Sequence, residues 1–124
     1  MANQPLILII EDEADIRTAL TMRLEAKGFA VASASDGVAG LKLAREITPS
    51  LIILDIMLPK MDGYTISRMF KYDERFSAIP IIMLTAKVQP KDIERGKEAG
   101  ADAYMTKPYE AEELIAKINE LLGR

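Results

Sequence analysis

Four apolar runs in this sequence each end in polar side chains that can do chemistry. The most informative of these side chains is Asp55, a single carboxylate that stands where the run 51–54 ends. A carboxylate at the point where a buried strand leaves the core suits a nucleophile better than a structural residue. The other runs end in acids, a hydroxyl and an amine. The residues of interest are Glu11, Asp12, Asp55, Thr85 and Lys107.

These side chains have the chemistry of a phosphoryl-transfer site. Three carboxylates that lie close together repel one another unless a cation joins them. Oxygen ligands that stay open to solvent suit Mg²⁺, which keeps several of its waters. The Asp55 carboxylate can attack phosphorus to give an aspartyl-phosphate, while Lys107 supplies a positive charge and Thr85 a hydroxyl donor to the phosphoryl oxygens.

The elements that must position these residues alternate along the chain. Apolar runs of strand length are separated by longer stretches of helical spacing, which predicts a parallel sheet covered by helices on both faces. In a flavodoxin-like (βα)5 sheet of order 2-1-3-4-5, the ligand site lies at the carboxyl ends of strands one and three. There Glu11 and Asp12 would face Asp55. We expect strands near 6–10, 29–34, 51–54, 80–84 and 102–106, and helices near 14–27, 36–47, 63–72, 90–99 and 110–122.

Glycines mark the ends of two helices and weaken one of them. Gly28 and Gly100 stand just past predicted helices, where a left-handed conformation favours glycine. The helix 90–99 has Ile93 as its only large apolar residue. It also contains Gly96, which costs about 1 kcal/mol relative to alanine inside a helix. We therefore expect this helix to be the most weakly held and to act as a moving part beside the site.

Composition restricts the class of protein. The chain has 124 residues, of which 49% are hydrophobic and 28% charged, as in a single soluble globular domain. Without cysteine it has no disulfide and no cysteine-based metal site. A net charge of −3 argues against a nucleic-acid surface. No apolar run approaches the roughly 20 residues of a membrane span, so we expect a cytoplasmic protein with no membrane partner.

Five short motifs follow one another in order along the chain. They are Ile9 to Glu13, Leu54 to Pro59, Met61 to Gly63, Leu84 to Ala86, and Gly100 to Tyr104 running into Thr106-Lys107-Pro108. Each motif is weak alone, but five in this order at this spacing are specific. On these motifs the chain resembles the CheY-like receiver domain of two-component response regulators. The resemblance covers essentially the whole chain and implies a single receiver domain over residues 1–124.

The resemblance implies a phospho-accepting switch rather than an enzyme that turns over another substrate. Asp55 would take a phosphoryl group from the phosphohistidine of a sensor histidine kinase or a histidine phosphotransfer protein. The domain would catalyse only its own aspartyl phosphorylation and dephosphorylation. The resemblance also implies a Mg²⁺ site, with Mn²⁺ as an alternative ion. Its ligands would be Glu11, Asp12, Asp55 and the backbone carbonyl of Met57.

The same resemblance implies a conformational readout at Thr85 and Tyr104. In receivers the hydroxyl residue moves toward the phosphoryl group, and the aromatic ring turns inward into the space that it leaves. The fourth helix, the fifth strand and the fifth helix then signal to a downstream effector domain or protein. Lys107-Pro108 resembles the family's cis peptide, which helps to aim the lysine.

Two further pairs of residues bear on how the switch is tuned. Met57 and Lys87 occupy positions that vary across the family and adjust phosphoryl lifetime. Ile93 and Ala103 fall where receivers joined to winged-helix DNA-binding domains commonly carry Arg and Asp for dimerisation. We therefore expect a monomer or a weak phosphorylation-dependent dimer, with no direct binding of nucleic acid by this domain.

Other readings fit parts of the pattern. A Mg²⁺-dependent phosphohydrolase that forms an aspartyl-phosphate usually needs a second acid two residues after its nucleophile, and that position is Met57. A pseudo-receiver would bind partners without phosphorylation, but the complete set of acid, hydroxyl and lysine argues against it. A flavodoxin-like FMN carrier needs a phosphate loop where this chain has three acids. Asp12 also has an ordinary alternative role as the N-cap of the first helix.

Overall fold

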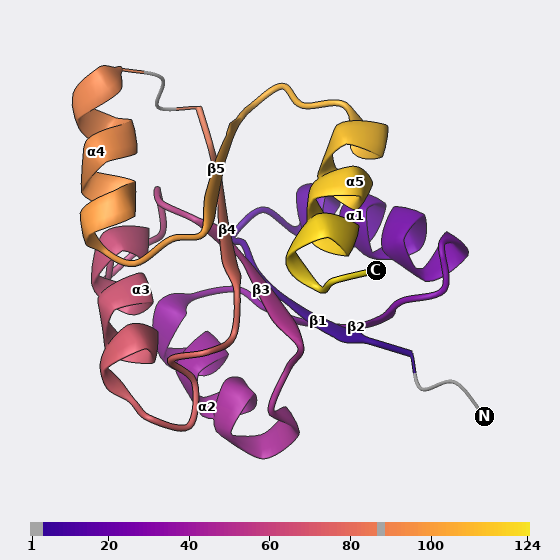
Figure 1. The fold of residues 1–124 in the computed structure, drawn as a ribbon, viewed down its shortest axis with the longest axis horizontal. Coiled ribbons are helices and arrows are strands. Elements are labelled where there is room, and N and C mark those ends of the chain that lie inside the picture. The colour runs from indigo at the N-terminus through magenta and orange to yellow at the C-terminus, as the bar shows by residue number, and fades with distance from the viewer. Residues whose placement is uncertain (1–3, 87–88) are drawn as a thin grey trace.

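Strands and helices alternate along the whole chain (Figure 1). The computed structural model describes residues 4–86 and 89–124. The strands are β1 (Leu6–Ile10), β2 (Ala30–Ala34), β3 (Leu51–Asp55), β4 (Ile81–Thr85) and β5 (Ala103–Thr106). The helices are α1 (Ala14–Ala26), α2 (Gly37–Ile47), α3 (Gly63–Tyr72), α4 (Pro90–Glu98) and α5 (Ala111–Leu121). Each bound lies within one residue of its expected position.

The strands form one parallel sheet in the order β2-β1-β3-β4-β5, which confirms the predicted flavodoxin-like fold. The register brings the carboxyl ends of the strands to the same level. Ile10 lies opposite Leu54, and Thr85 lies opposite Thr106. The residues that follow β1, β3 and β5 therefore leave the sheet at one edge, where a doubly wound fold binds its ligand.

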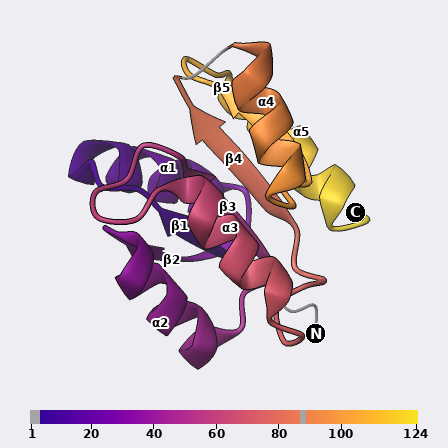
Figure 2. The same cartoon turned by 90° about the vertical axis from the view of Figure 1, so that its left-hand side faces the viewer.

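Helices cover both faces of the sheet. Figure 1 has α1 and α5 on one side, and Figure 2 views the face that carries α2, α3 and α4. Side chains of β1 alternate between the two layers, as expected for a strand buried on both faces. Ile7 and Ile9 pack in a cluster with residues of α1 and α5, while Leu8 and Ile10 pack in a cluster with residues of α2 and α3.

The glycine signals at the helix ends are confirmed. Gly28 has a φ of 91° and Gly100 a φ of 93°, both in the left-handed region. The start of α1 differs from one expectation, because its N-cap residue is Glu13 and no side chain caps it. The interpretation of Asp12 as an N-cap is therefore wrong. Asp12 lies one residue before the N-cap residue Glu13, outside the first helical turn.

Polar contacts hold α4 against α3. Ile93 is half-buried, and the buried positions of the helix are Asp92 and Gly96. The hydroxyl of Tyr64 donates to the Asp92 carbonyl at 3.1 Å. At the other end of α4, the hydroxyl of Ser67 donates to the carbonyl of its C-cap residue at 2.9 Å. Two buried hydrogen bonds thus supplement the sparse apolar packing expected for this helix.

None of the helices in the two described stretches of the chain is long and apolar enough to cross a membrane.

Candidate functional site

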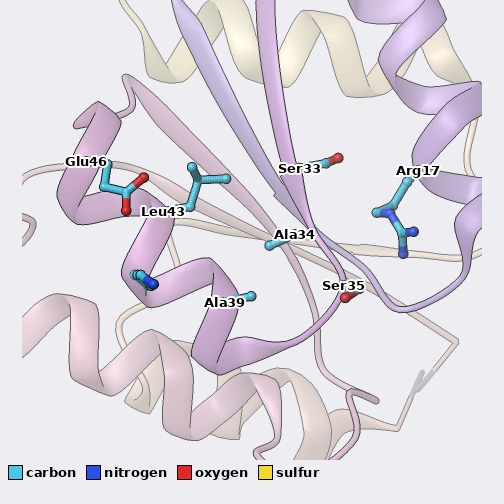
Figure 3. A pocket seen from close by; sticks show the side chains of 8 residues that line it. Arg17, Ser33, Ala34, Ser35, Ala39, Leu43 and Glu46 are labelled. Carbon is cyan, nitrogen blue, oxygen red and sulfur yellow. The ribbon is translucent and has the colours of Figure 1, made fainter.

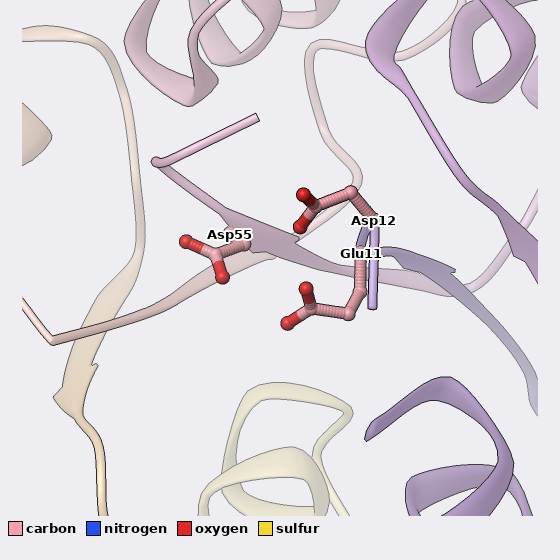
Figure 4. A group of neighbouring side chains, drawn as sticks. All are labelled: Glu11, Asp12 and Asp55. Atoms are coloured by element: carbon pink, nitrogen blue, oxygen red, sulfur yellow. The ribbon is translucent and has the colours of Figure 1, made fainter. Parts of the chain in front are cut away.

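Three carboxylates meet at the carboxyl edge of the sheet, as the sequence predicts. Glu11 and Asp12 follow β1, and Asp55 ends β3 (Figure 4). One carboxylate oxygen from each residue lies within 4.8 Å of the other two. Glu11 and Asp55 are buried, whereas Asp12 is exposed. The cluster therefore has two buried acids and one that faces solvent.

Lys107 joins the two buried acids. Its Nζ lies 2.8 Å from Oε1 of Glu11 and 2.7 Å from Oδ2 of Asp55. Burial lowers the pKa of Lys107, but its hydrogen bonds to Asp55 and Glu11 more than offset this and leave the pKa raised. Lys107 therefore remains a cation at neutral pH and compensates charge that would otherwise repel.

Backbone amides hold the other oxygens of the buried acids. Oδ1 of Asp55 accepts from the amide of Met57 at 2.9 Å, and Oε2 of Glu11 accepts from the amide of Glu13 at 3.1 Å. Burial is the main cause that raises the pKa of Glu11 to about 6, against the opposing effects of Lys107 and the Glu13 amide. Each buried carboxylate is thus fixed between an ammonium group and the amide two residues later.

Met57 stands at the mouth of the site. Met57 is 59% exposed and lines a cavity of about 480 Å³. Arg95 of α4 faces the same cavity, and its guanidinium lies 4.2 Å from the ring centroid of Tyr64. The other polar residues around this cavity are Asp12 and Asp62. The cavity therefore connects the exposed acid of the cluster to α4.

The predicted readout residues lie on neighbouring strands. Thr85 is fully buried at the end of β4, and its carbonyl accepts from the amide of Lys107 at 2.8 Å. Tyr104 of β5 is half-buried. Its pKa is raised, mainly by burial and to a smaller extent by the hydroxyl of Tyr64. The peptide bond between Lys107 and Pro108 is cis. Lys87, one of the predicted tuning positions, lies outside the described residues.

Two residues that position the acids were not predicted from the sequence. Nη1 of Arg17 donates to the carbonyl of Glu11 at 2.7 Å. Gly63 donates its amide to the carbonyl of Ile56 at 2.9 Å, and a Cβ at residue 63 would lie 2.6 Å from the Asp55 carbonyl oxygen. The Asp62-Gly63 pair signals a turn in the sequence, but the close approach to Asp55 is a contact of the folded chain.

A second cavity, of about 540 Å³, lies along the outer edge of β2 between α1 and α2 (Figure 3). Ser33, Ser35, Lys42 and Glu46 line it, together with Arg17. It contains none of the clustered carboxylates. We therefore assign the candidate site to the acidic cluster and the neighbouring 480 Å³ cavity, where the reactive groups converge.

Comparison with known proteins identifies the family. The sequence matches the response regulator receiver domain over residues 7–119, and the chain belongs to this family. It is 45% identical over 120 residues to the DNA-binding dual master transcriptional regulator RpaA of Synechocystis, an alignment that covers 97% of the chain and 50% of RpaA. It is 41% identical over 118 residues to the DNA-binding response regulator MtrA of Mycobacterium tuberculosis, covering 95% of the chain and 50% of MtrA.

Solved structures agree with this assignment. A crystal structure of a response regulator of Chloroflexus aurantiacus matches with a TM-score of 0.93 at 31% identity, covering 98% of this chain and 100% of that one. The receiver domain of a Pseudomonas aeruginosa sensor histidine kinase matches with a TM-score of 0.90 at 30% identity, over 98% of this chain and all of that one. That structure is described with a magnesium ion coordinated in its active site cleft.

The comparisons support a receiver domain of a response regulator in a two-component system. The chain spans about half the length of the curated relatives that it matches.

Proposed function

We propose that this domain accepts a phosphoryl group on Asp55 from the phosphohistidine of a sensor histidine kinase or a histidine phosphotransfer protein. The observation that supports this most strongly is the environment of the Asp55 carboxylate. It is buried at the end of β3, one oxygen accepts from the Met57 amide, and the other accepts from Lys107. A carboxylate held in a fixed orientation beside a cation suits attack on a phosphoryl group.

The proposed step transfers phosphorus between two nucleophiles. A carboxylate oxygen of Asp55 forms a bond to phosphorus as the bond from phosphorus to the histidine nitrogen breaks. The imidazole nitrogen keeps the electron pair of the broken bond, and the product is an acyl phosphate on Asp55. Lys107 remains protonated and offsets negative charge on the phosphoryl oxygens, while Thr85 supplies a hydroxyl donor to them.

The acidic cluster has the donor set that Mg²⁺ prefers. All its side-chain ligands are oxygens, and Asp12 is open to solvent. When bound, the ion would neutralise charge on the phosphoryl oxygens. Mn²⁺ would suit the same ligands as an alternative. The residues that would hold the ion are Glu11, Asp12 and Asp55, with the carbonyl of Met57.

The domain would act on itself and on no other substrate. It would catalyse its own phosphorylation and dephosphorylation. A phosphohydrolase is disfavoured because the site lacks the second acid that such an enzyme places two residues after its nucleophile. The thioether side chain of Met57 stands at that position and is largely exposed. Phosphorylation would instead change the arrangement of Thr85, Tyr104 and the surface formed by α4, β5 and α5.

The proposed output is a downstream effector domain or protein. RpaA and MtrA are both named as DNA-binding regulators, and each is about twice as long as this chain. We propose that a comparable effector carries any binding of nucleic acid, and that the receiver itself binds none. Its proposed oligomeric state is a monomer or a weak dimer formed on phosphorylation.

Intact mass spectrometry tests the acceptor assignment. The native protein, Asp55→Asn and Asp15→Asn are each incubated with Mg²⁺ and acetyl phosphate, beside a receiver known to accept from this donor. Asp15 is an exposed acid on α1 and serves as the matched control. We expect one added phosphoryl group on the native protein and on Asp15→Asn, and none on Asp55→Asn. Unlabelled native protein would refute the function, and a labelled Asp55→Asn variant would refute the residue.

A further inference from the structure

The ring of Tyr104 occupies a defined position beneath α4. It packs against a buried cluster formed by Ile56, Tyr64, Met83 and Ala99. The backbone of Gly96 lies so near the ring that a Cβ there would be 2.8 Å from Cδ2 and 3.1 Å from Cε2 of Tyr104. Real Cβ atoms essentially never make contacts as short as 2.8 Å, so with a side chain at residue 96 the ring or the helix would have to shift.

This contact changes the interpretation of Gly96. Alanine is the better helix former, and from the sequence alone the glycine only weakens α4. In the structure Gly96 is buried and faces Tyr104. The same missing side chain that lowers the helix propensity therefore makes room for the aromatic ring.

Tyr64 contacts both α4 and the segment that follows the strand ending in Asp55. Tyr64 is 1% exposed and belongs to the same cluster as Ile56, the residue after Asp55. Its hydroxyl donates to the carbonyl of Asp92 in the first turn of α4 at 3.1 Å. Tyr64 thus connects the end of β3 to the helix that covers Tyr104.

Arg95 holds the Tyr64 ring from the side of the site cavity. Its guanidinium lies 4.2 Å from the ring centroid, and it lines the cavity that also contains Asp12 and Met57. A cation over an aromatic face is attracted by the ring quadrupole. Tyr64 therefore contacts α4 twice, through its hydroxyl at the Asp92 carbonyl and through its ring face at Arg95.

We propose that Gly96 and Tyr64 are positioning residues for Tyr104. Gly96 leaves room for the Tyr104 ring, and Tyr64 holds α4 at the distance from the sheet at which this ring fits. This inference rests on the proposed function, in which the inward ring accompanies phosphorylation of Asp55. A Cβ at residue 96 would push the ring outward, and loss of the Tyr64 hydroxyl would let α4 move away from its position over the ring.

The first test observes the ring itself, without any phosphoryl analogue. Nuclear Overhauser contacts between the Tyr104 ring and the Met83 methyl group are measured in the native protein and in Gly96→Ala. We expect these contacts in the native protein and their loss in the variant. Lys97→Ala, an exposed change in the same helix, should keep them. Contacts that persist unchanged in Gly96→Ala would overturn the proposal.

The second test measures coupling to the acceptor. Beryllium fluoride, a non-covalent analogue of a phosphoryl group on a carboxylate, is titrated in the presence of saturating Mg²⁺. We expect its apparent affinity to fall about tenfold in Gly96→Ala, because the competent conformation becomes rarer. In Tyr64→Phe, which loses the buried hydrogen bond to the Asp92 carbonyl, it should fall about 2- to 10-fold. The affinity for Mg²⁺ alone should stay at the native value in both variants.

Two comparisons separate positioning from a general loss of structure. In a Tyr104→Ala background, Gly96→Ala should have little further effect on beryllium fluoride binding, because only Sδ of Met83, 3.3 Å from the new Cβ, remains close to it. An equal effect in both backgrounds would overturn the proposal. Ser50→Ala removes a hydroxyl that accepts from the Leu6 amide at the far end of the sheet, so it should lower stability without changing this affinity.

Failure of the proposed function would look different from failure of this inference. A native protein that binds no beryllium fluoride and accepts no phosphoryl group would refute the function, while the ring contacts would still report on Gly96. A native protein that binds the analogue, with Gly96→Ala and Tyr64→Phe both at native affinity, would refute the positioning roles alone.

Discussion

The ammonium of Lys107 and the carboxylate of Asp55 are 2.7 Å apart, although 52 positions separate them in the chain. The same ammonium lies 2.8 Å from Glu11, so one cation serves two buried acids. The register of the sheet produces this arrangement, because β5 delivers Lys107 to the edge at which β1 and β3 end. The charge balance of the site therefore depends on one lysine.

Replacing Lys107 by methionine should destabilise the metal-free protein. Removing one partner of a fully buried ion pair costs about 3–5 kcal/mol because the remaining charge is uncompensated. Lys107 keeps 21% of its side chain exposed, so we expect the free energy of unfolding to fall by a smaller amount, about 1–3 kcal/mol. Urea unfolding without divalent ions measures it.

A second variant isolates the electrostatic origin of that loss. Adding Glu11→Gln to Lys107→Met removes one of the two uncompensated acids and should recover part of the lost stability. Mg²⁺ should also stabilise Lys107→Met more than it stabilises the native protein, because it supplies the missing positive charge. If neither change restores stability, the lysine acts through packing of its alkyl chain rather than its charge.

Asp12→Asn should separate metal binding from stability. Asp12 is exposed and does not cap α1, so without Mg²⁺ the free energy of unfolding should change by no more than about 0.5 kcal/mol. Loss of a ligand should weaken Mg²⁺ binding at least about tenfold. The thermal midpoint of the variant should then respond less to added Mg²⁺ than that of native protein or Asp15→Asn. A native-like Mg²⁺ response would remove Asp12 from the ligand set.

Gly63→Ala should be more destabilising than Gly37→Ala, although both glycines begin a helix directly after a capping aspartate. A Cβ at residue 63 would lie 2.6 Å from the Asp55 carbonyl oxygen and 2.6 Å from Cα of Ile56, and this backbone has little freedom to move. A Cβ at residue 37 would meet Cδ1 and Cγ1 of the buried Ile66 side chain, atoms that can shift more readily than backbone.

Because helix propensity affects both glycine positions alike, their difference in unfolding free energy reports the backbone clash. We expect Gly63→Ala to cost about 1–3 kcal/mol, as for other overpacked sites. We also expect it to slow phosphorylation of Asp55, whose backbone must shift. Equal costs at both positions in urea unfolding would show that the close approach to Asp55 is relieved without strain.

The fold and the composition of the site could be predicted because both depend on short-range patterns. Buried parallel strands are continuous apolar runs, and their carboxyl ends share one edge, so the polar residue after each run is a candidate ligand. Glu11, Asp12, Asp55, Thr85 and Lys107 all follow or end such runs. To predict that these residues meet at one edge of the sheet, only the strand order was needed.

Contacts between distant residues could not be predicted in the same way. Nζ of Lys71 donates to Oδ2 of Asp102 at 3.1 Å and to the carbonyl of Ile79 at 2.9 Å. The same Asp102 oxygen accepts from the amide of Ile81 at 2.8 Å, which fixes the start of β4. In a sequence, a lone lysine and a lone aspartate 31 positions apart are typical of a solvated surface. Gly96 was misleading for the same reason, because its partner Tyr104 lies on another element.

Tyr109, two residues after Lys107, should make stability depend on alkaline pH. Burial raises its pKa above the ordinary value of 10.0, although the positive charges of Lys107 and Arg23 oppose the shift. The unfolded chain therefore loses this proton at a lower pH than the folded protein does. Between the two pKa values the folded state binds more protons, so its stability is intact below about pH 10 and declines as the pH rises further.

Tyr109→Phe removes this titration while keeping the ring. The difference in unfolding free energy between variant and native protein, measured in urea at pH 8 and at pH 11, should move in favour of the variant at the higher pH. Tyr104 and Lys107 also have raised pKa values, but they titrate in both proteins and cancel in the difference. An unchanged difference would mean that the Tyr109 hydroxyl ionises equally easily in the folded and unfolded chains, and that the loop after Lys107 does not exclude water from it.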